Sequence, residues 1–156
     1  FMRLDPWRLV MRDAPGHSAT QLTCHLTDLG ALIAADMLSD IEPPILEGPC
    51  APYRETLEAL LVLAEHGAIE TLVPGHGSVA EGREAVLARF RTDLDYLAAL
   101  ERGARDAAGR GETLEAAQET LAAMDYTGRR SATYPTGTFH RENIRFAYRD
   151  VVQPRH

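Results

Sequence analysis

Apolar and polar residues alternate along the first third of the chain with the period of two that is typical of β-strands. Residues 7–13 (WRLVMRD) alternate loosely, residues 21–28 (QLTCHLTD) alternate regularly, and residues 31–38 (ALIAADML) form a short apolar run. Alternation predicts a strand with one buried face, whereas a short apolar run predicts a strand covered on both faces. The sequence therefore predicts a hairpin that enters a covered sheet.

The alternation in residues 21–28 also predicts which side chains are buried. Leu22, Cys24 and Leu26 share one face. We expect this face to line the core, with Cys24 as a small buried hydrophobic residue. The opposite face is polar, and we expect it to be exposed, so that His25 is a surface residue; this face comprises Gln21, Thr23 and His25.

A proline-rich segment separates these strands from the first helix. Residues 41–52 (IEPPILEGPCAP) contain four of the nine prolines, which predicts a rigid loop placed where a substrate-facing segment would lie. Leucine and alanine then recur at helical spacing as far as Gly67, where the helix is expected to end. A short strand over residues 69–73 (IETLV) follows.

Helices are predicted for the rest of the chain. Ser78 and Glu81 have the spacing of a capping box, which predicts a helix start, and apolar residues recur at helical spacing over residues 86–100. A second helix follows a glycine-bearing break. Residues 126–140 predict a loop and residues 141–151 a terminal helix. The order of strands, helix, strand and then helices predicts an α/β or α+β fold with a helical tail.

Charge and hydropathy exclude several classes of partner. The chain has 156 residues, a formal net charge of -7 and a pI near 5.3. An acidic domain gains nothing from counterion release, which disfavours a general nucleic-acid-binding function. No apolar run approaches the roughly 20 residues that span a bilayer, and the first ten residues lack the apolar segment of a signal peptide. We therefore expect a cytoplasmic protein with no nucleic-acid or membrane partner.

Three residues that commonly bind metals follow the ends of predicted strands. His17 and His76 each follow a Pro-Gly pair, and Asp36 lies toward the end of the apolar run. Because α/β proteins form their sites at the carboxyl edge of the strands, we expect these side chains to converge. Two neutral imidazoles and a carboxylate are ligands that zinc prefers. Taken singly, each has a plain alternative as a turn residue.

The segments APGHSAT (14–20), AADMLSD (34–40) and VPGHGSV (73–79) resemble, in this order, the last three motifs of the metallo-β-lactamase superfamily. The resemblance extends from about Trp7 through the helices, and it departs from the family pattern at Ala35, where a glycine is usual. It implies an α/β fold: the second half of a four-layer αβ/βα sandwich with a helical C-terminal tail.

The resemblance also implies a site and a reaction. His17 would bind one metal ion, Asp36 would bridge two ions as the catalytic carboxylate, and His76 would bind the other. The implied cofactor is two zinc ions per complete site, with iron or manganese as alternatives. A hydroxide held by both metals would attack a small-molecule substrate. The aspartate bridge resembles the glyoxalase II-like branch, which favours an ester, thioester or lactone.

The family's HxHxDH motif is absent, because no two of the six histidines are separated by a single residue. His17, Asp36 and His76 provide at most one terminal ligand per ion plus the bridge, whereas each ion needs about four ligands. We therefore expect this chain to supply part of a site that the missing N-terminal half or a second subunit completes. A non-catalytic interaction domain on the same scaffold is the alternative.

The chain is expected to divide into two parts. Residues 1–128 form the C-terminal half of the metallo-β-lactamase-like domain with its helical extension, and residues 129–156 form a C-terminal loop and docking helix. Arg141, Arg145 and Arg149 form a stripe at i, i+4 spacing. The stripe suits contact with an acidic surface or, as a second reading, an anionic substrate.

Three further residues keep open roles. Asp40 is a rival of Asp36 as a ligand. His66, at a predicted helix end, suits the helix dipole, and His140 either caps the last helix or approaches the site. A disulfide between the two cysteines is a minor alternative, because nothing indicates an oxidising compartment.

Overall fold

A mixed sheet with helices on one face forms the body of the computed structural model, which describes residues 2–124 and 136–153. The six strands are hydrogen-bonded in the order of the sequence. Their bounds are β1 (Met2–Leu4), β2 (Trp7–Asp13), β3 (Leu22–Leu26), β4 (Ala31–Ala35), β5 (Thr71–Pro74) and β6 (Ala80–Glu81).

The direction of the strands sets which chain segments meet at one edge. The pairs from β1 to β4 are antiparallel, β4 and β5 are parallel, and β5 and β6 are antiparallel. The strands β2, β4 and β5 therefore run in the same direction. The segments that follow them all begin at the same edge of the sheet.

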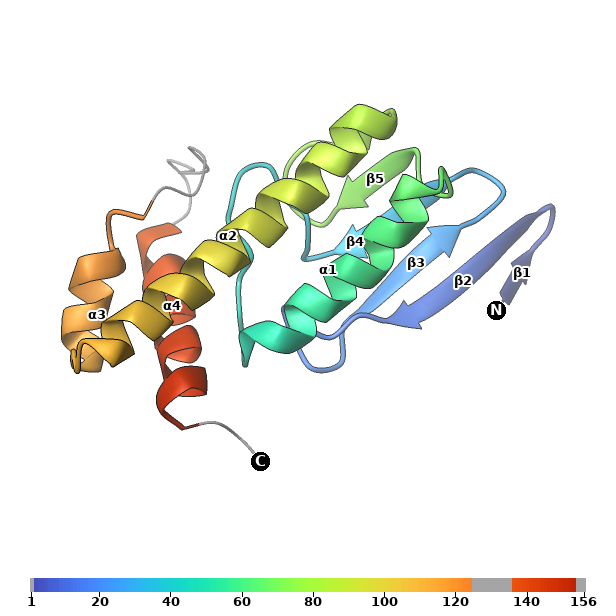
Figure 1. Cartoon of the computed structure of the whole chain (residues 1–156). Coiled ribbons are helices and arrows are strands. Elements are labelled where there is room, and N and C mark those ends of the chain that lie inside the picture. The colour runs from blue at the N-terminus through green and yellow to red at the C-terminus, as the bar shows by residue number, and fades with distance from the viewer. Residues whose placement is uncertain (1, 125–135, 154–156) are drawn as a thin grey trace.

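The helices cover one face of the sheet and extend beyond it. Figure 1 shows α1 (Cys50–Glu65) and α2 (Arg83–Gly109) lying across the sheet, with α3 (Leu114–Leu121) and α4 (Thr136–Val152) beyond its end. None of the helices in the described part of the chain combines the length and apolar character that crossing a bilayer requires. The core lies between the helices and the sheet; its fully buried residues include Leu32, Leu57, Leu72, Phe90, Leu97 and Ile144.

The strand β3 buries the face that its pattern predicted to be exposed. His25 is 3% exposed, and its Nε2 lies 2.8 Å from the carbonyl oxygen of Ala68, just past the end of α1. Leu22 is 39% exposed and Cys24 is partly exposed. The predictions of a buried Cys24 and a surface His25 are therefore wrong. Alternation fixes which residues share a face, but it does not fix which face meets the helices.

The apolar side chains of β3 belong to a larger open face. Met11 is opposite Cys24, and Cys24 is opposite Ile33, so these residues share one side of the sheet. The open sheet face, as we call it, comprises Trp7 (45% exposed), Met11 (48%), Leu22 (39%), Cys24 and Ile33 (42%). A contiguous exposed apolar surface of this kind marks a contact site.

Two helix starts differ from the sequence-based expectation. The prediction of a capping box at Ser78 and Glu81 is wrong. Glu81 lies in β6 opposite Thr71, and the helix α2 begins after Gly82. The last helix begins at residue 136, within the predicted loop 126–140. The buried His140 lies in its first turns, so tertiary contacts override the local sequence. Residues 125–135 of that loop, and the expected division at 128/129, lie outside the described residues.

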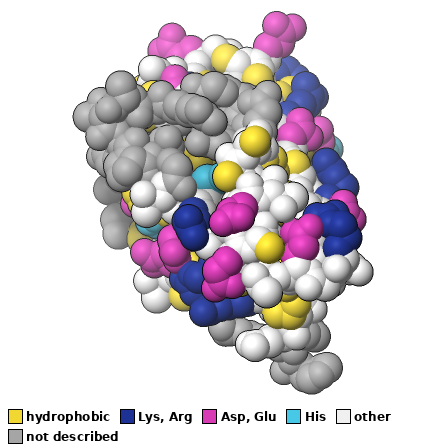
Figure 2. Space-filling model, turned by 90° about the vertical axis from the view of Figure 1, so that its left-hand side faces the viewer, with side chains coloured by type: hydrophobic (Ala, Val, Ile, Leu, Met, Phe, Trp, Pro, Cys, Tyr) yellow, Lys and Arg dark blue, Asp and Glu magenta, His cyan; other side chains and the backbone are white. Residues whose placement is uncertain are grey.

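Buried contacts hold α4 to the rest of the molecule. Ile144 and Asn143 are fully buried, and Ala147 is 2% exposed. On the described part of the helical end, arginine and acidic side chains are interspersed at the surface (Figure 2). Arg145 and Glu142 of α4 form an ion pair. Exposed pairs contribute little to stability, so the buried face of α4 accounts for its attachment.

The two faces of β4 predict opposite responses to truncation. Leu32 is fully buried under the helices, so Leu32→Ala is expected to lower the free energy of unfolding by about 2–5 kcal/mol. Its neighbour Ile33 lies on the open sheet face, and Ile33→Ala is expected to cost less than about 1 kcal/mol. Urea unfolding of the 156-residue chain followed by circular dichroism measures both. Equal losses would contradict an open face.

Candidate metal centre

Three strand ends bring His17, Asp36 and His76 to one edge of the sheet. His17 lies in the turn after β2, Asp36 directly follows β4, and His76 lies two residues beyond β5. The strands run in the same direction, so their carboxyl ends meet. The three side chains therefore lie close together, as expected.

The carboxylate of Asp36 lies between the two imidazoles. Nε2 of His17 is 3.8 Å from Oδ2 of Asp36, and Nε2 of His76 is 3.4 Å from the other oxygen, Oδ1. The side chain of His17 is 20% exposed, and those of Asp36 and His76 are 45% and 43% exposed. Each oxygen of the carboxylate thus faces a different histidine, on a surface that solvent reaches.

A backbone contact selects the tautomer of His17. Its Nδ1 lies 3.2 Å from the carbonyl oxygen of Ile45. A carbonyl oxygen only accepts, so Nδ1 is the donor in this hydrogen bond, and in the neutral imidazole Nε2 then carries the lone pair. Nε2 is the nitrogen that faces Asp36. A backbone carbonyl that orients the far nitrogen in this way is common behind metal-binding histidines.

The parallel strands β4 and β5 approach closely beside Asp36, and a side chain at residue 75 would crowd them. The amide of Gly75 donates to the carbonyl of Ala35 at 2.7 Å. A Cβ at Gly75 would lie 2.5 Å from Oδ1 of Asp36. Ala35 itself has a φ of 49°, in the left-handed region that favours glycine. The departure from the family pattern at this position therefore places a strained alanine next to Asp36.

The spacing of these donor atoms can be compared with the spacing of zinc ligands. Ligand atoms bound to one tetrahedral zinc at its usual bond lengths are about 3.4 Å apart, which is close to both measured separations. Within residues 2–124 and 136–153, however, no three His, Cys, Asp or Glu side chains enclose one ion. Each oxygen of the carboxylate instead has one imidazole nitrogen near it.

Asp40 is engaged elsewhere, so it does not compete with Asp36. Its Oδ1 accepts from the amide of Ser78 at 2.9 Å, and its Oδ2 is 2.9 Å from Nη2 of Arg89. Partial burial acts to raise the pKa of Asp40, but the Ser78 hydrogen bonds and the charge of Arg89 outweigh it and lower the pKa. The role of Arg89 was not predicted. No signal distinguishes it from the other arginines of a charged helix.

His140 and His66 have their hydrogen-bond partners away from the three edge residues. His140 lies between the hydroxyl of Tyr96 and the carbonyl of Leu121, at 2.9 Å from each. It neither caps α4 nor approaches the site. His66 follows the last residue of α1, and its Nδ1 is 2.7 Å from the carbonyl of Val62, in agreement with a role at the helix end.

The arginine stripe of α4 makes contacts within the chain. Nε of Arg141 donates to Gln118 of α3 at 3.1 Å. Arg145 pairs with Glu142 at 2.7 Å, and its guanidinium lies 4.2 Å from the centre of the Phe146 ring. Arg141 thus contacts α3 through an amide side chain, and Arg145 pairs within its own helix.

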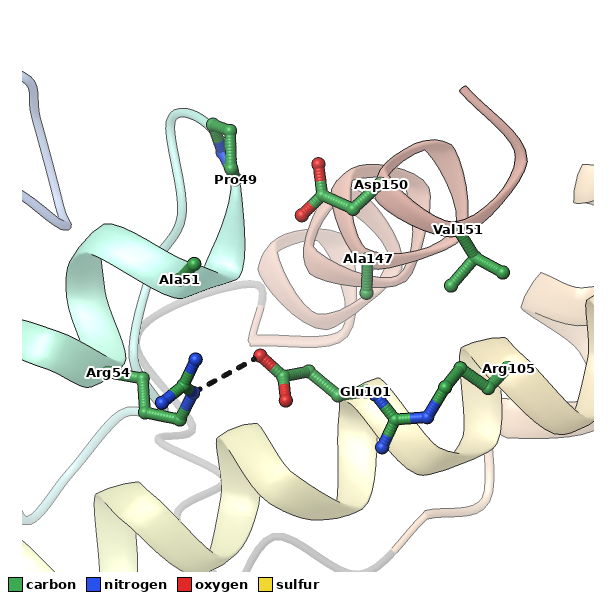
Figure 3. Close-up of a pocket in the computed structure, with 8 residues that line it drawn as sticks. All are labelled: Pro49, Ala51, Arg54, Glu101, Arg105, Ala147, Asp150 and Val151. Atoms are coloured by element: carbon green, nitrogen blue, oxygen red, sulfur yellow. Dashed lines mark ion pairs between the residues drawn. The ribbon is translucent and has the colours of Figure 1, made fainter. Parts of the chain in front are cut away.

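A hollow of about 500 Å³ lies between α1, α2 and α4, and none of the three edge residues lines it. Figure 3 shows Arg54 and Glu101 directed at each other across it, with 3.6 Å between Nε and Oε1. On its other side Asp150 accepts from the amide of Cys50 at 3.1 Å. Burial, with the nearby charges of Asp150 and Glu101, raises the pKa of Cys50 to about 12. The hollow adds no ligand to the centre.

Solved structures with this fold were found by comparison of coordinates, whereas no family model and no curated protein matches the sequence. The chain is 17% identical to the stereoselective inverting sec-alkylsulfatase from Pseudomonas sp., with a TM-score of 0.72 over 99% of this chain. It is 21% identical to a metallo-β-lactamase family protein from Thermus thermophilus, with a TM-score of 0.59 over 92%. A β-lactamase domain protein from Burkholderia ambifaria is 17% identical, with a TM-score of 0.55 over 94%.

These matches cover only part of the similar structures. The chain spans 25%, 46% and 42% of their respective lengths. The expected α/β architecture is confirmed, and the likeness to these structures is one of fold. The chain has the fold of one part of a metallo-β-lactamase superfamily protein.

Proposed function

We propose that this chain supplies one half of a dinuclear metal centre in a hydrolase of the glyoxalase II-like type. His17 binds one ion, His76 binds the other, and Asp36 bridges the two. The observation that carries the proposal is the placement of Asp36, whose two oxygens face two different imidazole nitrogens at 3.8 and 3.4 Å.

The chain's own residues account for how such a centre is held. Zinc or a similar divalent ion, when bound, supplies Lewis acidity and lowers the pKa of a coordinated water. The Ile45 carbonyl keeps Nε2 of His17 available as a ligand. Gly75 leaves room for the carboxylate of Asp36. The side chains of Asp36 and His76 are nearly half exposed, so a small substrate can reach the edge of the sheet.

The open sheet face supports the proposal that another part of the fold completes the centre. It exposes Trp7, Met11 and Ile33 on the side of the sheet opposite the helices. The similar structures are two to four times longer than the part matched. We place the missing N-terminal half of the fold against this face, with a second subunit as the other source. That half would also provide the ligands that this chain lacks.

The substrate class rests on the bridging carboxylate. The similar structures include an alkylsulfatase by its name and proteins named only by family, so they do not fix a substrate. An ester, thioester or lactone is the class we favour, because the aspartate bridge resembles that of thioester hydrolases. Two free cysteines support a cytoplasmic location.

Metal content tests the centre directly. The complete protein, purified with its remaining half and dialysed, is expected to retain about two ions per site. His17→Ala and His76→Ala should each lose one, and Asp36→Asn should weaken binding of both by about 100-fold or more. Inductively coupled plasma mass spectrometry gives the stoichiometry, and hydrolysis of model thioesters and lactones gives the activity.

His66→Ala is the matched control for the metal experiment. This exposed histidine lies at the far end of α1. The variant protein should therefore keep both ions. A metal-free wild-type protein would refute the centre and leave the non-catalytic interaction domain.

The two cysteines test what covers the open sheet face. In the 156-residue chain, Cys24 is partly exposed and is expected to react with iodoacetamide at pH 8. Cys50 is 1% exposed with a pKa of about 12, so it should resist. In the complete protein Cys24 should become at least tenfold less reactive, because apolar side chains cover it. Mass spectrometry of peptides reports both sites, with Cys50 as the internal reference. Unchanged labelling of Cys24 would place the missing half elsewhere.

A further inference from the structure

Two sets of polar contacts on the helical side reach the segments that carry His17 and His76. One set joins Asp40 and Arg89 to the turn after β5. The other joins Asn143 of α4 to the loop before α1. The two sets share no residue, and each reaches a different histidine.

The turn that carries His76 is held by a carboxylate. Oδ1 of Asp40 accepts from the amide of Ser78, two residues past His76, at 2.9 Å. Gly77 lies between them with a φ of 93°, and a Cβ there would lie 2.1 Å from the same oxygen. The turn is thus packed directly on Asp40, and its conformation depends on that carboxylate.

Arg89 connects this turn to the segment that carries Asp36. Its side chain is 15% exposed. Nη1 donates to the carbonyl of Leu38 at 3.0 Å, and Nη2 donates to the carbonyl of Ser78 at 3.1 Å. Nη2 also lies 2.9 Å from Oδ2 of Asp40. A planar guanidinium with several donors fixes these groups relative to one another. Arg89 therefore holds the turn after β5 at a fixed position relative to the segment after β4.

The loop that orients His17 is held by Asn143. Ile45 provides the carbonyl that binds Nδ1 of His17. The residues on both sides of Ile45 are bound by one side chain: Oδ1 of Asn143 accepts from the amide of Leu46 at 2.9 Å, and its Nδ2 donates to the carbonyl of Pro44 at 2.6 Å. The carbonyl of Ile45 therefore has little freedom to turn away.

Asn143 is itself fixed by a buried network. It is fully buried, and its Nδ2 also donates to the hydroxyl of Tyr96 at 2.7 Å. That hydroxyl donates to Nδ1 of His140, whose Nε2 donates to the carbonyl of Leu121. All these donors and acceptors are mutually consistent, and a satisfied buried network is rigid. The helical tail is thus connected to His17 through these hydrogen bonds and the short backbone segment of residues 44–46.

We propose that Arg89 and Asn143 are positioning residues, each for a different histidine: Arg89, together with Asp40, for His76, and Asn143, through residues 44–46, for His17. The assignment rests on the proposed dinuclear centre. Metal ligands tolerate displacements of only about 0.5 Å, so release of either segment should weaken one ion more than the other.

Crossed effects of variants in the complete protein test this assignment. In the metal-free protein, Arg89→Met is expected to shift and broaden the imidazole nitrogen resonances of His76 and leave those of His17 unchanged. Asn143→Ala should do the reverse, with partial loss of the Nδ1–H tautomer of His17. In Co²⁺ titrations followed by visible absorption, each variant should weaken one of the two ions by about tenfold or more.

Milder variants cover the case in which these proteins fail to fold. Asp40→Asn keeps the shape of its side chain and should act as Arg89→Met does, and Tyr96→Phe keeps its ring and should act as Asn143→Ala does. Arg8→Met, which breaks the exposed pair with Asp28, is the control and should affect neither histidine.

The outcomes separate this assignment from the proposed function. Equal effects of each variant on both histidines, or no effect on either, would overturn the assignment. A wild-type protein that binds no Co²⁺ would overturn the dinuclear centre, while the crossed pattern of resonances in the metal-free protein would still decide whether each residue positions its own histidine.

Discussion

The parallel pairing of β4 with β5 is the constraint on which the candidate centre depends. It brings Asp36 and His76 out of adjacent strands at the same edge, where a Cβ at residue 75 would lie 2.5 Å from Oδ1 of Asp36 and 3.0 Å from the carbonyl oxygen of Ala35. This pairing is accompanied by a positive φ at Ala35. Strain of this kind persists where the surrounding structure fixes it, and here the hydrogen bond from Gly75 to Ala35 does so.

The edge residues could be predicted from sequence because each follows a local signal. Proline and glycine end a strand in a recognisable way, and strand ends in α/β sheets gather at one edge whatever the details of packing. His17, Asp36 and His76 therefore converge as expected. The residues behind them could not be predicted. Arg89 and Asn143 act across long sequence separations, and no local pattern reports contacts of that range.

The prediction for β3 chose the wrong face as the buried one, and the reason is physical. The period of two correctly grouped Leu22 with Cys24 and Thr23 with His25, but assigning the apolar group to the core assumed that the core lies within this chain. The helices instead cover the polar group, and the apolar group faces outward. The error is informative, since apolar residues placed outward along β2, β3 and β4 are what a sheet requires when a second layer is to pack on it.

The two faces of the sheet therefore have separate functions in the proposed hydrolase. The helical face, through α2 and α4, fixes the positions of the ligands that this chain contributes. The open face, which lacks comparable polar contacts among the described residues, can gain a large apolar contact without disturbing those positions. The half-centre at the strand edge is thus organised before its other half arrives. In the proposed centre, a carboxylate held between two imidazoles would lower the entropy cost of assembling the complete site, and the helical tail would contribute by holding the segments that carry these residues.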